Sequence, residues 1–487
     1  MAGLGLVAQL ALSGCTGTAE PPGDPRGSTG ASTPTSGASV SATNPAGPGA
    51  DGPLGFHWDM SKSEVWAPYL RTVPGTGTFF EFTWCEVEKR QGAQDWSKVD
   101  RAVAFAGSVG VTMTLKIRLG ACWATQGDAQ HTKGSSGTRT ESRMPNDMAA
   151  YQAFVRTVVM RYSPAGVHEY AVENEVNGAG YWAGSAADYT TLVRAAATAI
   201  HDADPAARVV DSGLSSTTYG YGIASSLLDQ RQVTQAVAAW NTYYERRMGT
   251  RGTTFQPATD EASLRRMLAD DQGRRNLEFL AAVERLAADH VIDIRQFHFY
   301  ERAAATGLLM GYLHAHTPSD VPLEGWEVGL FWRDGAHEAA SQAQSDEMVQ
   351  SVATLLAQGA RRVFWLPLAT NPNNKAGGEV RSGVLEPDGS ERIASVAFRT
   401  IAVAARGASI APITATGLSG VVLRTTASTT LILWTTAGER SLTLAAGATG
   451  GPVGAIPGSL TTLKIGAAPM VVTSTTQTTD EILSTLS

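Results

Sequence analysis

The sequence is poor in cysteine and has no long apolar run. Only three of its 487 residues are cysteine, namely Cys15, Cys85 and Cys122. No Cys-x-x-Cys pair and no cluster of cysteine and histidine has the spacing of metal ligands. No apolar run reaches the roughly 18 residues that a transmembrane helix requires. The sequence therefore predicts neither a zinc module nor a helix that spans a membrane.

Runs of basic residues are absent as well. The chain has 38 Lys and Arg residues against 45 Asp and Glu residues, a formal net charge of −7. This mildly acidic balance makes nucleic acid a poor candidate partner. Hydrophobic residues make up 43% of the chain, so a large core can be buried. The length suits a barrel of roughly 250 to 400 residues with an accessory module.

The first 50 residues have the composition of a leader and a tether. A short apolar stretch ends in Leu12-Ser13-Gly14-Cys15, which resembles a bacterial lipoprotein signal in which Cys15 is lipidated. Residues 1–11 lack Lys and Arg, so an ordinary signal peptide or an unmodified Cys15 are the alternatives. Residues 16–50 are almost all Pro, Gly, Ser, Thr and Ala, which predicts a disordered linker. We expect an extracytoplasmic bacterial protein, either secreted or held at the membrane only through a lipid anchor.

Between residues 51 and 405, short runs of β-formers alternate with helical patterns. This alternation is typical of parallel βα units, and eight units favour a closed (β/α)8 TIM barrel. Segment 220–290 is longer than one βα loop requires, which predicts additional helices beside the barrel mouth. The eight expected strands are 54–59, 77–84, 111–119, 168–175, 207–214, 292–300, 322–328 and 361–368.

After residue 405 the helical periodicity stops. Segment 406–487 contains short runs rich in Thr, Val and Leu, such as 420–426 and 429–436, separated by Gly- and Ala-rich turns. This pattern predicts a small antiparallel β-sandwich as an accessory domain. The predicted fold class is thus α/β, with a catalytic barrel followed by a β-sandwich.

Two glutamates stand at strand ends, where active sites of such barrels form. Glu175 closes the fourth expected strand and Glu327 closes the seventh. Glu327 lies between Trp326 and Val328, where a carboxylate is costly without a purpose. Glycosidic cleavage needs one acid to protonate the leaving oxygen and a second carboxylate to attack the anomeric carbon or to activate water. Two strand ends that face each other across a barrel mouth can supply this pair.

The motifs around these glutamates resemble those of clan A retaining glycoside hydrolases. In that clan the fourth strand typically ends in Trp-Asn-Glu-Pro-Asn and the seventh in Glu-x-Gly. Here the fourth reads Glu-Asn-Glu-Val-Asn over 173–177 and the seventh reads Glu-Val-Gly over 327–329, so Glu173 and Val176 depart from the pattern. The resemblance implies that Glu175 is the acid/base and Glu327 the nucleophile.

Further residue roles follow from the resemblance. Asn174 would bind the sugar 2-hydroxyl, Tyr300 would hydrogen-bond the nucleophile, and Trp365 would form a floor for the sugar. Strand alternation puts His298 on the same face as Tyr300, so His298 is also a substrate-site candidate. The alternatives are a structural role for His298 and core packing for Trp365. Glu324 is the alternative nucleophile, although it lacks the Glu-x-Gly spacing.

Other candidates come from the strand pattern alone. Arg118 ends the third expected strand, where Lys116 and Arg118 alternate with apolar residues, and it is a candidate for binding sugar. Glu173 shares a strand face with Glu175, and His57 shares one with Asp59 on the first strand. For Arg118 and Glu173 the alternative is an internal salt bridge.

Cys85 and Cys122 follow the second and third expected strands, which should be neighbours. In an extracytoplasmic protein they could form a disulfide, and the alternative is two buried thiols.

Segment 84–100 resembles the second βα unit of families 39 and 42, and the C-terminal module resembles the β-sandwich that follows the barrel in family 39. Family 39 is therefore the most similar in appearance, with a resemblance also to families 5 and 42, over roughly residues 51–475. It implies a carbohydrate substrate such as a β-linked xyloside or glucoside, cleaved by double displacement without a metal or organic cofactor. Two other functions stay open. One is a non-catalytic carbohydrate-binding lipoprotein on a hydrolase scaffold, and the other is a transglycosylase.

Overall fold

The computed structural model describes most of the chain after residue 51. The predicted signal segment 1–15, with Cys15, and the predicted linker 16–50 lie outside the described residues. Every described residue falls in one compact unit, Ala42–Ser487. None of the described helices is long and apolar enough to cross a membrane. The described stretches are 52–127, 131–134, 137–248, 255–333, 341–370, 375–376 and 379–487.

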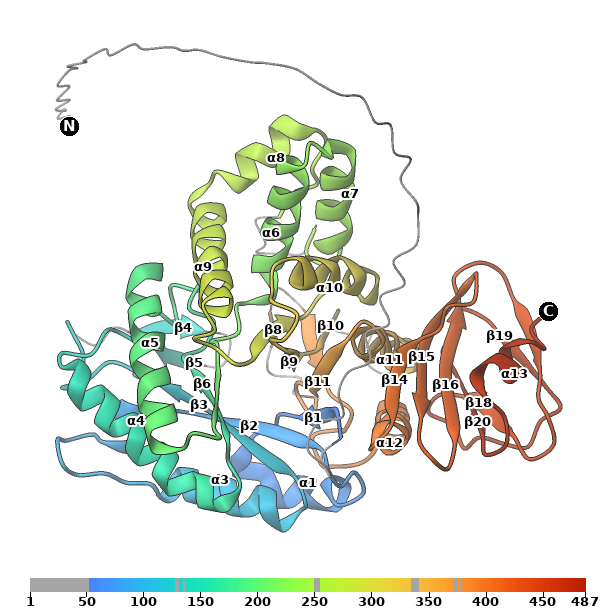
Figure 1. The fold of residues 1–487 in the computed structure, drawn as a ribbon, viewed down its shortest axis with the longest axis horizontal. Coiled ribbons are helices and arrows are strands. Elements are labelled where there is room, and N and C mark those ends of the chain that lie inside the picture. Colours follow the sequence, from blue (N-terminus) through green and yellow to red (C-terminus); the bar gives the residue numbers. More distant parts are fainter. Residues whose placement is uncertain are drawn as a thin grey trace, which may run out of the picture. The chain divides into compact units, whose positions relative to one another are not determined.

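Eight parallel strands form a barrel, as the sequence predicts (Figure 1). They pair in the order β7-β6-β3-β2-β1-β11-β9-β8. Parallel bridges from Val210 to Ile294 and from Leu214 to Phe297 link the two outer strands and complete the ring. Each expected strand segment overlaps one barrel strand. The strands are β1 (Leu54–Phe56), β2 (Gly77–Thr83), β3 (Thr112–Arg118), β6 (Glu169–Val172), β7 (Arg208–Val210), β8 (Arg295–Phe299), β9 (Leu323–Val328) and β11 (Ala360–Trp365).

Helices follow every barrel strand, which makes each connection a βα unit. After β7 the chain inserts four helices, α6 to α9, as expected from the length of segment 220–290. The helices are α1 (Ser63–Leu70), α2 (Trp84–Val87), α3 (Ser97–Ser108), α4 (Met148–Tyr162), α5 (Ala186–Ala203), α6 (Ser216–Asp229), α7 (Val233–Tyr243), α8 (Glu261–Leu268), α9 (Asp271–Ala288), α10 (Thr306–Ala315), α11 (Ser341–Ala357) and α12 (Ile393–Ala405). Short 3-10 helices are η1 (Met60–Lys62), η2 (Ser163–Ala165) and η3 (Ala303–Ala305).

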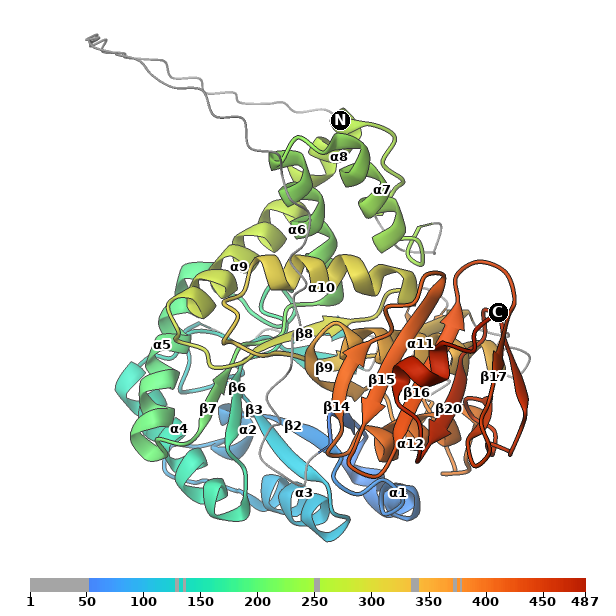
Figure 2. The same ribbon diagram turned by 45° about the vertical axis from the view of Figure 1, so that its right-hand side comes forward.

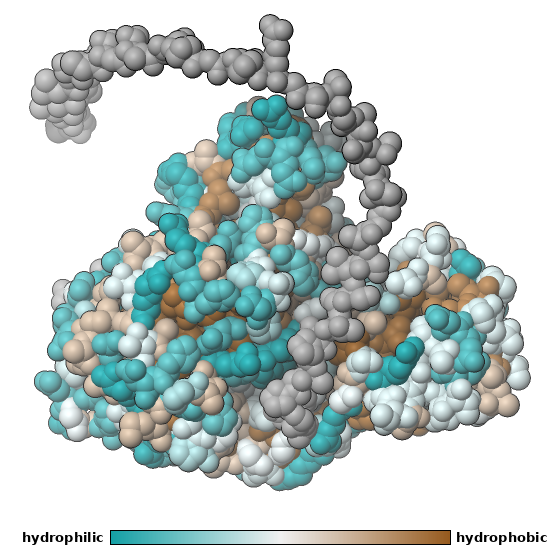
Figure 3. Space-filling view, viewed as in Figure 1, coloured by the Kyte–Doolittle hydropathy of each residue, from teal (hydrophilic) through white to brown (hydrophobic). Residues whose placement is uncertain are grey.

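The insertion is held together by aromatic packing. Tyr221 of α6, Trp240 of α7 and Tyr244 contact one another, and Phe255 stacks on Tyr244. Helix α9 packs on α5 and α6, which joins the insertion to the helices around the barrel. Helix α8 buries only Leu264 and presents a hydrophilic surface (Figure 3). The aromatic residues of the insertion thus extend the main apolar cluster of the barrel, while α8 keeps a polar exterior.

A layer of large side chains fills the barrel interior, as in other barrels of this kind. It includes Phe79 of β2, Trp326 of β9 and Phe364 of β11, whose rings contact one another. The pairing of β8 with β9 skips one residue, because Phe297 pairs with Gly325 whereas His298 pairs with Glu327. Trp326 is the extra residue of this β-bulge. The bulge lets Trp326 pack in the core while Glu327 sits beside His298.

A charged cluster closes the opposite end of the barrel, where the strands begin. Glu324 of β9 binds Arg361 and Arg362 of β11, and it accepts a hydrogen bond from the indole of Trp326. The same arginines bind Glu169, the first residue of β6. Burial opposes ionisation of Glu324, but Arg362 and Arg361 outweigh it and hold the pKa of Glu324 below its usual value.

The C-terminal segment is an antiparallel β-sandwich, as predicted. Alternating residues of β15 and β16 face two different cores: Leu431 and Leu433 pack inside the sandwich, whereas Val421, Leu423 and Ile432 join the barrel's apolar cluster. Helices α11 and α12 contact β15 directly (Figure 2). The sheets contain β14 (Ser409–Pro412), β15 (Leu418–Arg424), β16 (Thr429–Thr435), β20 (Met470–Ser474) and β18 (Thr449–Pro452), and separately β17 (Arg440–Thr443) and β19 (Thr462–Ile465), with α13 (Thr479–Leu483) near the C-terminus.

Two small sheets extend from the strand ends. One is the hairpin of β4 (His131–Gly134) and β5 (Gly137–Thr140) after β3. The other joins β10 (Leu330–Arg333), which follows β9, to β13 (Glu379–Ser382) and β12 (Lys375–Ala376), which follow β11. Because both arise after barrel strands end, they border the C-terminal mouth of the barrel.

Candidate active site

A cavity of about 740 Å³ opens at the C-terminal ends of the barrel strands. Its walls include Thr83 at the end of β2, Arg118 at the end of β3, and Leu366 just after β11. Glu175 and Glu327, from opposite parts of the sequence, both line it. The cavity therefore lies where active sites form in barrels of this architecture.

The two glutamates converge in this cavity. One oxygen of Glu175, one oxygen of Glu327 and one ring nitrogen of His298 all lie within 4.8 Å of one another. Retaining glycosidases hold their two carboxyl groups about 5 to 5.5 Å apart, whereas inverting enzymes need about 6.5 Å or more to admit a water. The closest oxygens of Glu175 and Glu327 thus lie no more than 4.8 Å apart, which is nearer to the shorter of these two separations.

The backbone after β6 aims Glu175 at the cavity. Glu173 and Glu175 have positive φ angles of 68° and 42°, a left-handed conformation that is costly for residues other than glycine. The amide of Glu175 donates to the carbonyl oxygens of Ser212 and Gly213, which follow β7. His298 Nδ1 then lies 2.9 Å from Glu175 Oε1. The strained turn is thus tied to the segment after β7 and to His298 of β8.

Glu327 is surrounded by groups that favour its charged form. Lys116 Nζ donates to Glu327 Oε1 at 2.9 Å, and the Tyr300 hydroxyl donates to Oε2 at 2.9 Å. Burial raises the pKa of Glu327, but His298, Lys116 and Arg381 outweigh burial and hold the pKa well below its usual value. Burial in turn raises the pKa of Tyr300 well above its usual value. Glu327 is therefore ionised at neutral pH while Tyr300 keeps its proton.

Lys116 was not among the candidates from the sequence, although it has the central position. It comes from the middle of β3 and its side chain is fully buried. The signal was present, because an ionisable residue between Leu115 and Ile117 is costly unless it is paired. A search for buried charges on inward-facing strand positions would have found it.

Arg118 and Glu173 form an ion-pair network beside the cavity. Arg118 binds Glu81 at 2.9 Å and Glu173 at 3.5 Å, and Glu173 also accepts a hydrogen bond from the amide of Leu119. Burial raises the pKa of Glu173, an effect that Arg118 partly offsets. Arg118 and Glu81 line the cavity, whereas Glu173 does not. Glu173 thus takes the salt-bridge role that was the alternative to substrate contact.

The two candidates on the first expected strand, His57 and Asp59, lie in different places. His57 lines the cavity, stacks on Phe79 and has Nδ1 3.1 Å from the Phe79 carbonyl oxygen. Burial lowers the pKa of His57 to about 4, so it is neutral at neutral pH. Asp59 is exposed and caps η1 by accepting from the Ser61 amide. The expectation that Asp59 shares the face of His57 is wrong because β1 ends at Phe56.

Trp365 does not form the cavity floor. Its side chain is 2% exposed, packs in the core, and donates from the indole to the Ser382 carbonyl oxygen. The pairing of β11 with β9 shifts between Val363 and Trp365, and it is the following residue, Leu366, that lines the cavity. His298 and Tyr300 are also buried beneath the cavity, where they contact the glutamates.

Arg381 is a cavity residue that no sequence signal indicated. It lies on β13, and its guanidinium covers the rings of Tyr300 at 4.7 Å and Phe331 at 5.2 Å. Its charge contributes to the low pKa of Glu327. The hairpin β12–β13 brings it to the site from far along the chain.

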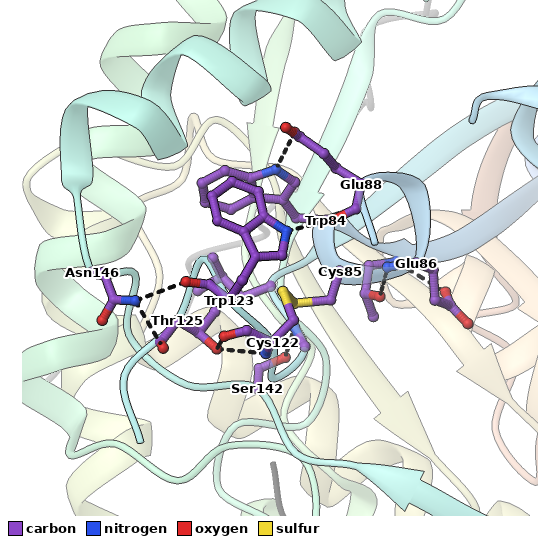
Figure 4. Close-up of a disulfide and its surroundings, with 12 residues drawn as sticks. Trp84, Cys85, Glu86, Glu88, Cys122, Trp123, Thr125, Ser142 and Asn146 are labelled. Atoms are coloured by element: carbon purple, nitrogen blue, oxygen red, sulfur yellow. Dashed lines mark hydrogen bonds between the residues drawn. A yellow bond between two sulfur atoms is a disulfide. The ribbon is translucent and has the colours of Figure 1, made fainter. Parts of the chain in front are cut away.

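A disulfide joins Cys85 to Cys122, as predicted for neighbouring strand ends (Figure 4). Both cysteines line the cavity. Beside them, the indoles of Trp84 and Trp123 lie edge to face and donate to the side chain and the carbonyl oxygen of Glu88, respectively (Figure 4). The disulfide thus ties the loops after β2 and β3 together at the cavity rim.

The trio of Glu175, His298 and Glu327 offers atoms close enough for one metal ion. However, the Lys116 ammonium already binds Glu327 Oε1 and lies 3.4 Å from His298 Nε2. A cation placed among these atoms would face that charge in a buried site, which is unfavourable. The donor set therefore suits a protein ammonium better than a metal.

No protein-family model matches the sequence, and no curated protein sequence matches it. The fold, in contrast, is shared with glycoside hydrolases of known structure. A family 39 glycoside hydrolase from the gut symbiont Bacteroides cellulosilyticus WH2 matches at a TM-score of 0.59 and 12% identity, over 86% of this chain and 80% of that one. A family 39 β-xylosidase from Caulobacter crescentus matches at 0.54 and 15%, over 88% and 97%.

A glucosidase from Croceicoccus marinus matches at a TM-score of 0.51 and 10% identity, over 88% of this chain and 96% of that one. At such low identities, the similarity establishes the fold. It agrees with the family 39 resemblance of the motifs and with a barrel that is followed by a β-sandwich.

Proposed function

We propose that this protein is a retaining glycoside hydrolase that uses Glu175 as acid/base and Glu327 as nucleophile. The observation that carries the proposal is the approach of these two carboxyl groups to within 4.8 Å in a cavity at the barrel mouth. The lowered pKa of Glu327 and the short distance between the closest oxygens of the two glutamates support the assignment. The fold shared with family 39 enzymes adds support from an independent comparison.

The proposed reaction has two steps. Glu327 attacks the anomeric carbon while Glu175 gives its proton to the leaving oxygen, which forms a covalent glycosyl-enzyme. Glu175 then takes a proton from water as the water attacks the same carbon and releases Glu327. Tyr300 and Lys116 hold Glu327 in place through hydrogen bonds to its two oxygens.

Asn174 is the proposed contact for a sugar hydroxyl. It lines the cavity, and its Oδ1 accepts a hydrogen bond from Lys116 at 2.7 Å, which leaves its NH2 group as the donor for substrate. Arg118, Arg381 and His57 complete the polar wall. By the family 39 resemblance we propose a β-linked xyloside or glucoside as the first substrates to try.

The test is a screen of aryl glycosides with the wild-type protein, Glu175→Gln and Glu327→Gln. We expect the wild type to hydrolyse at least one glycoside and to release the anomer of the same configuration, as followed by proton NMR. Glu175→Gln should lose roughly 10²- to 10⁴-fold in rate with poor leaving groups and much less with dinitrophenyl glycosides, which need no acid. A product of inverted configuration would contradict the mechanism, and tight glycan binding without hydrolysis would favour the non-catalytic alternative.

We also propose that the protein acts outside the cytoplasm, anchored through a lipid on Cys15. The disulfide at the cavity rim supports an oxidising compartment. Expression of wild-type and Cys15→Ala proteins in a bacterial host would test the anchor. The wild type should fractionate with membranes and incorporate labelled fatty acid, and equal membrane binding by Cys15→Ala would refute it.

A further inference from the structure

Lys116 contacts the proposed nucleophile and two further polar residues of the site. Its Nζ donates to Asn174 Oδ1 at 2.7 Å and to Glu327 Oε1 at 2.9 Å, and it lies 3.4 Å from His298 Nε2. The ring of Phe79 covers it at 4.2 Å. An ammonium has three donors and no acceptor. These three neighbours therefore account for its full hydrogen-bonding capacity, which fixes its position.

The ammonium also fixes the proton on His298. Because Lys116 can only donate, Nε2 of His298 must carry the lone pair and Nδ1 must carry the hydrogen. Nδ1 then donates to Glu175 Oε1 at 2.9 Å and lies 3.5 Å from Glu327 Oε2. When Glu175 is an acid, its own proton accordingly sits on Oε2.

We propose that Lys116 is the permanent counter-charge of both half-reactions, acting on Glu327 directly and on Glu175 through His298. The inference rests on the proposed function and assigns a positioning residue to it. In the first step, the C–O bond from Glu327 to the sugar forms, the glycosidic C–O bond breaks, and the Glu175 proton moves to the leaving oxygen. The negative charge thus passes from Glu327 to Glu175, and the second step returns it.

The hydrogen bonds among Lys116, His298 and the two glutamates can accommodate this movement of charge. Lys116 and the two glutamates together carry one positive and one negative charge before and after each step, so no net charge has to be buried anew, which would be costly. Before the first step Lys116 binds the charged Glu327, and in the intermediate the polarised His298 N–H binds the charged Glu175. Other titratable groups around the site include His57, Glu81, Arg118, Asp211 after β7, Tyr300 and Arg381. Among the described residues, His298 is the side chain that contacts both carboxylates.

The first variant is Lys116→Met, compared with Lys464→Met as a matched control. Lys464 binds Glu439 at 2.9 Å, the same distance as Lys116 to Glu327, but this pair is exposed on the β-sandwich. The acid limb of the kcat/KM profile reports Glu327. In Lys116→Met this limb should move up by about 1 to 3 pH units, the effect of losing a nearby opposite charge. Lys464→Met should have the wild-type profile.

The second readout separates the half-reactions. With a dinitrophenyl glycoside, hydrolysis of the glycosyl-enzyme is rate-limiting and dinitrophenol is released in a burst. With a glycoside that has a poor leaving group, formation of the glycosyl-enzyme is rate-limiting, so the measured rate is that of the first step. In Lys116→Met, both rates should fall at least tenfold. His298→Asn keeps a donor near Nδ1 but removes Nε2, so it should slow both rates. Because His298 also favours the charged form of Glu327, the acid limb of this variant should move up as well.

The outcomes are distinct from those of the proposed function. If the wild type hydrolyses no glycoside, or Glu327→Gln stays active, the hydrolase assignment itself fails. If the wild type is active, Glu327→Gln is inactive, and a folded Lys116→Met keeps both its acid limb and its half-reaction rates, the role of Lys116 is refuted. Should Lys116→Met not fold by circular dichroism, His298→Asn decides, because unchanged half-reaction rates in that variant would also refute the link to Glu175.

Discussion

Glu324 and Glu327 lie three residues apart on the same strand, yet the structure gives them opposite ends of the barrel. Glu324 is at the start of β9, where Arg361 and Arg362 bind it away from the cavity. Glu327 is at the end of β9, where Lys116 and Tyr300 bind it and one side of its carboxylate meets the cavity. Both carboxyls are buried and both have a lowered pKa.

The comparison shows that burial and a shifted pKa do not by themselves mark a reactive carboxylate. Glu324 pairs with two guanidinium groups but does not line the cavity. Glu327 has a second carboxylate, Glu175, within reach across an open cavity. The access to a cavity and the second carboxylate are what separate a site for chemistry from a structural ion pair.

The largest expected effect is on activity, from Glu327→Gln. This change removes the nucleophile while keeping its shape, so kcat should fall by roughly 10⁴-fold or more, the scale seen when a covalent nucleophile is lost. Steady-state hydrolysis of the best aryl glycoside is the measurement. Glu324→Gln is the matched control, because it makes the same change on the same strand and should keep near-normal kcat per folded molecule. Similar losses of kcat in both variants would contradict the distinction between a reactive Glu327 and a structural Glu324.

Glu324→Gln should instead reduce stability. The neutral amide removes the Glu324 charge from Arg361 and Arg362, which are partly exposed and still bind Glu169, and this should cost roughly 1–3 kcal/mol of unfolding free energy. Urea unfolding followed by tryptophan fluorescence measures it. An unfolding free energy equal to that of the wild type would mean that the cluster at this end of the barrel contributes nothing to stability.

The loss of folding stability at low pH should also depend on Glu324. The pKa of Glu324 is lower when folded than its unfolded value of about 4.3. Its contribution to stability is therefore complete above that value and is lost as the pH falls through the folded pKa. Between pH 7 and pH 3, the free energy of unfolding should drop less in Glu324→Gln than in the wild type. An equal drop in both proteins would show that other groups cause the acid sensitivity.

The smallest effect is expected from Tyr300→Phe at the cavity end. Loss of one hydrogen bond to the charged Glu327 should lower kcat/KM by roughly tenfold. It should also move the acid limb upward, because the hydroxyl favours the ionised carboxylate. A pH series of kcat/KM would reveal both changes. An unchanged acid limb would indicate that Lys116 and His298 alone set the ionisation of Glu327.

The sequence predicted the architecture well because each strand and helix has its own periodicity. The βα alternation identified all eight barrel strands, and the runs after residue 405 identified most of the sandwich. The short strands β14 and β18, with Ser409–Pro412 and the Gly-rich Thr449–Pro452, lacked such a pattern. The positions of Glu175 and Glu327 followed from a general rule about strand ends in barrels.

The missed details depend on irregular backbone and on contacts between distant segments. The bulge at Trp326 and the shift before Trp365 change which side chains face the interior, and strand alternation cannot reveal such irregularities. Asp59 was misplaced because β1 stops at Phe56. Arg381 reaches the site through pairing of β10 with β13, a contact that no local pattern encodes.

The most direct test of the account is to trap the covalent intermediate. The wild-type protein would be incubated with a 2-deoxy-2-fluoro glycoside that carries a dinitrophenyl leaving group, chosen from the sugar that it cleaves best, and its proteolytic peptides analysed by mass spectrometry. The account predicts one added sugar on Glu327, none on Glu324, and recovery of activity as the label is released. A label on another residue, or complete inactivity toward every activated glycoside, would contradict it.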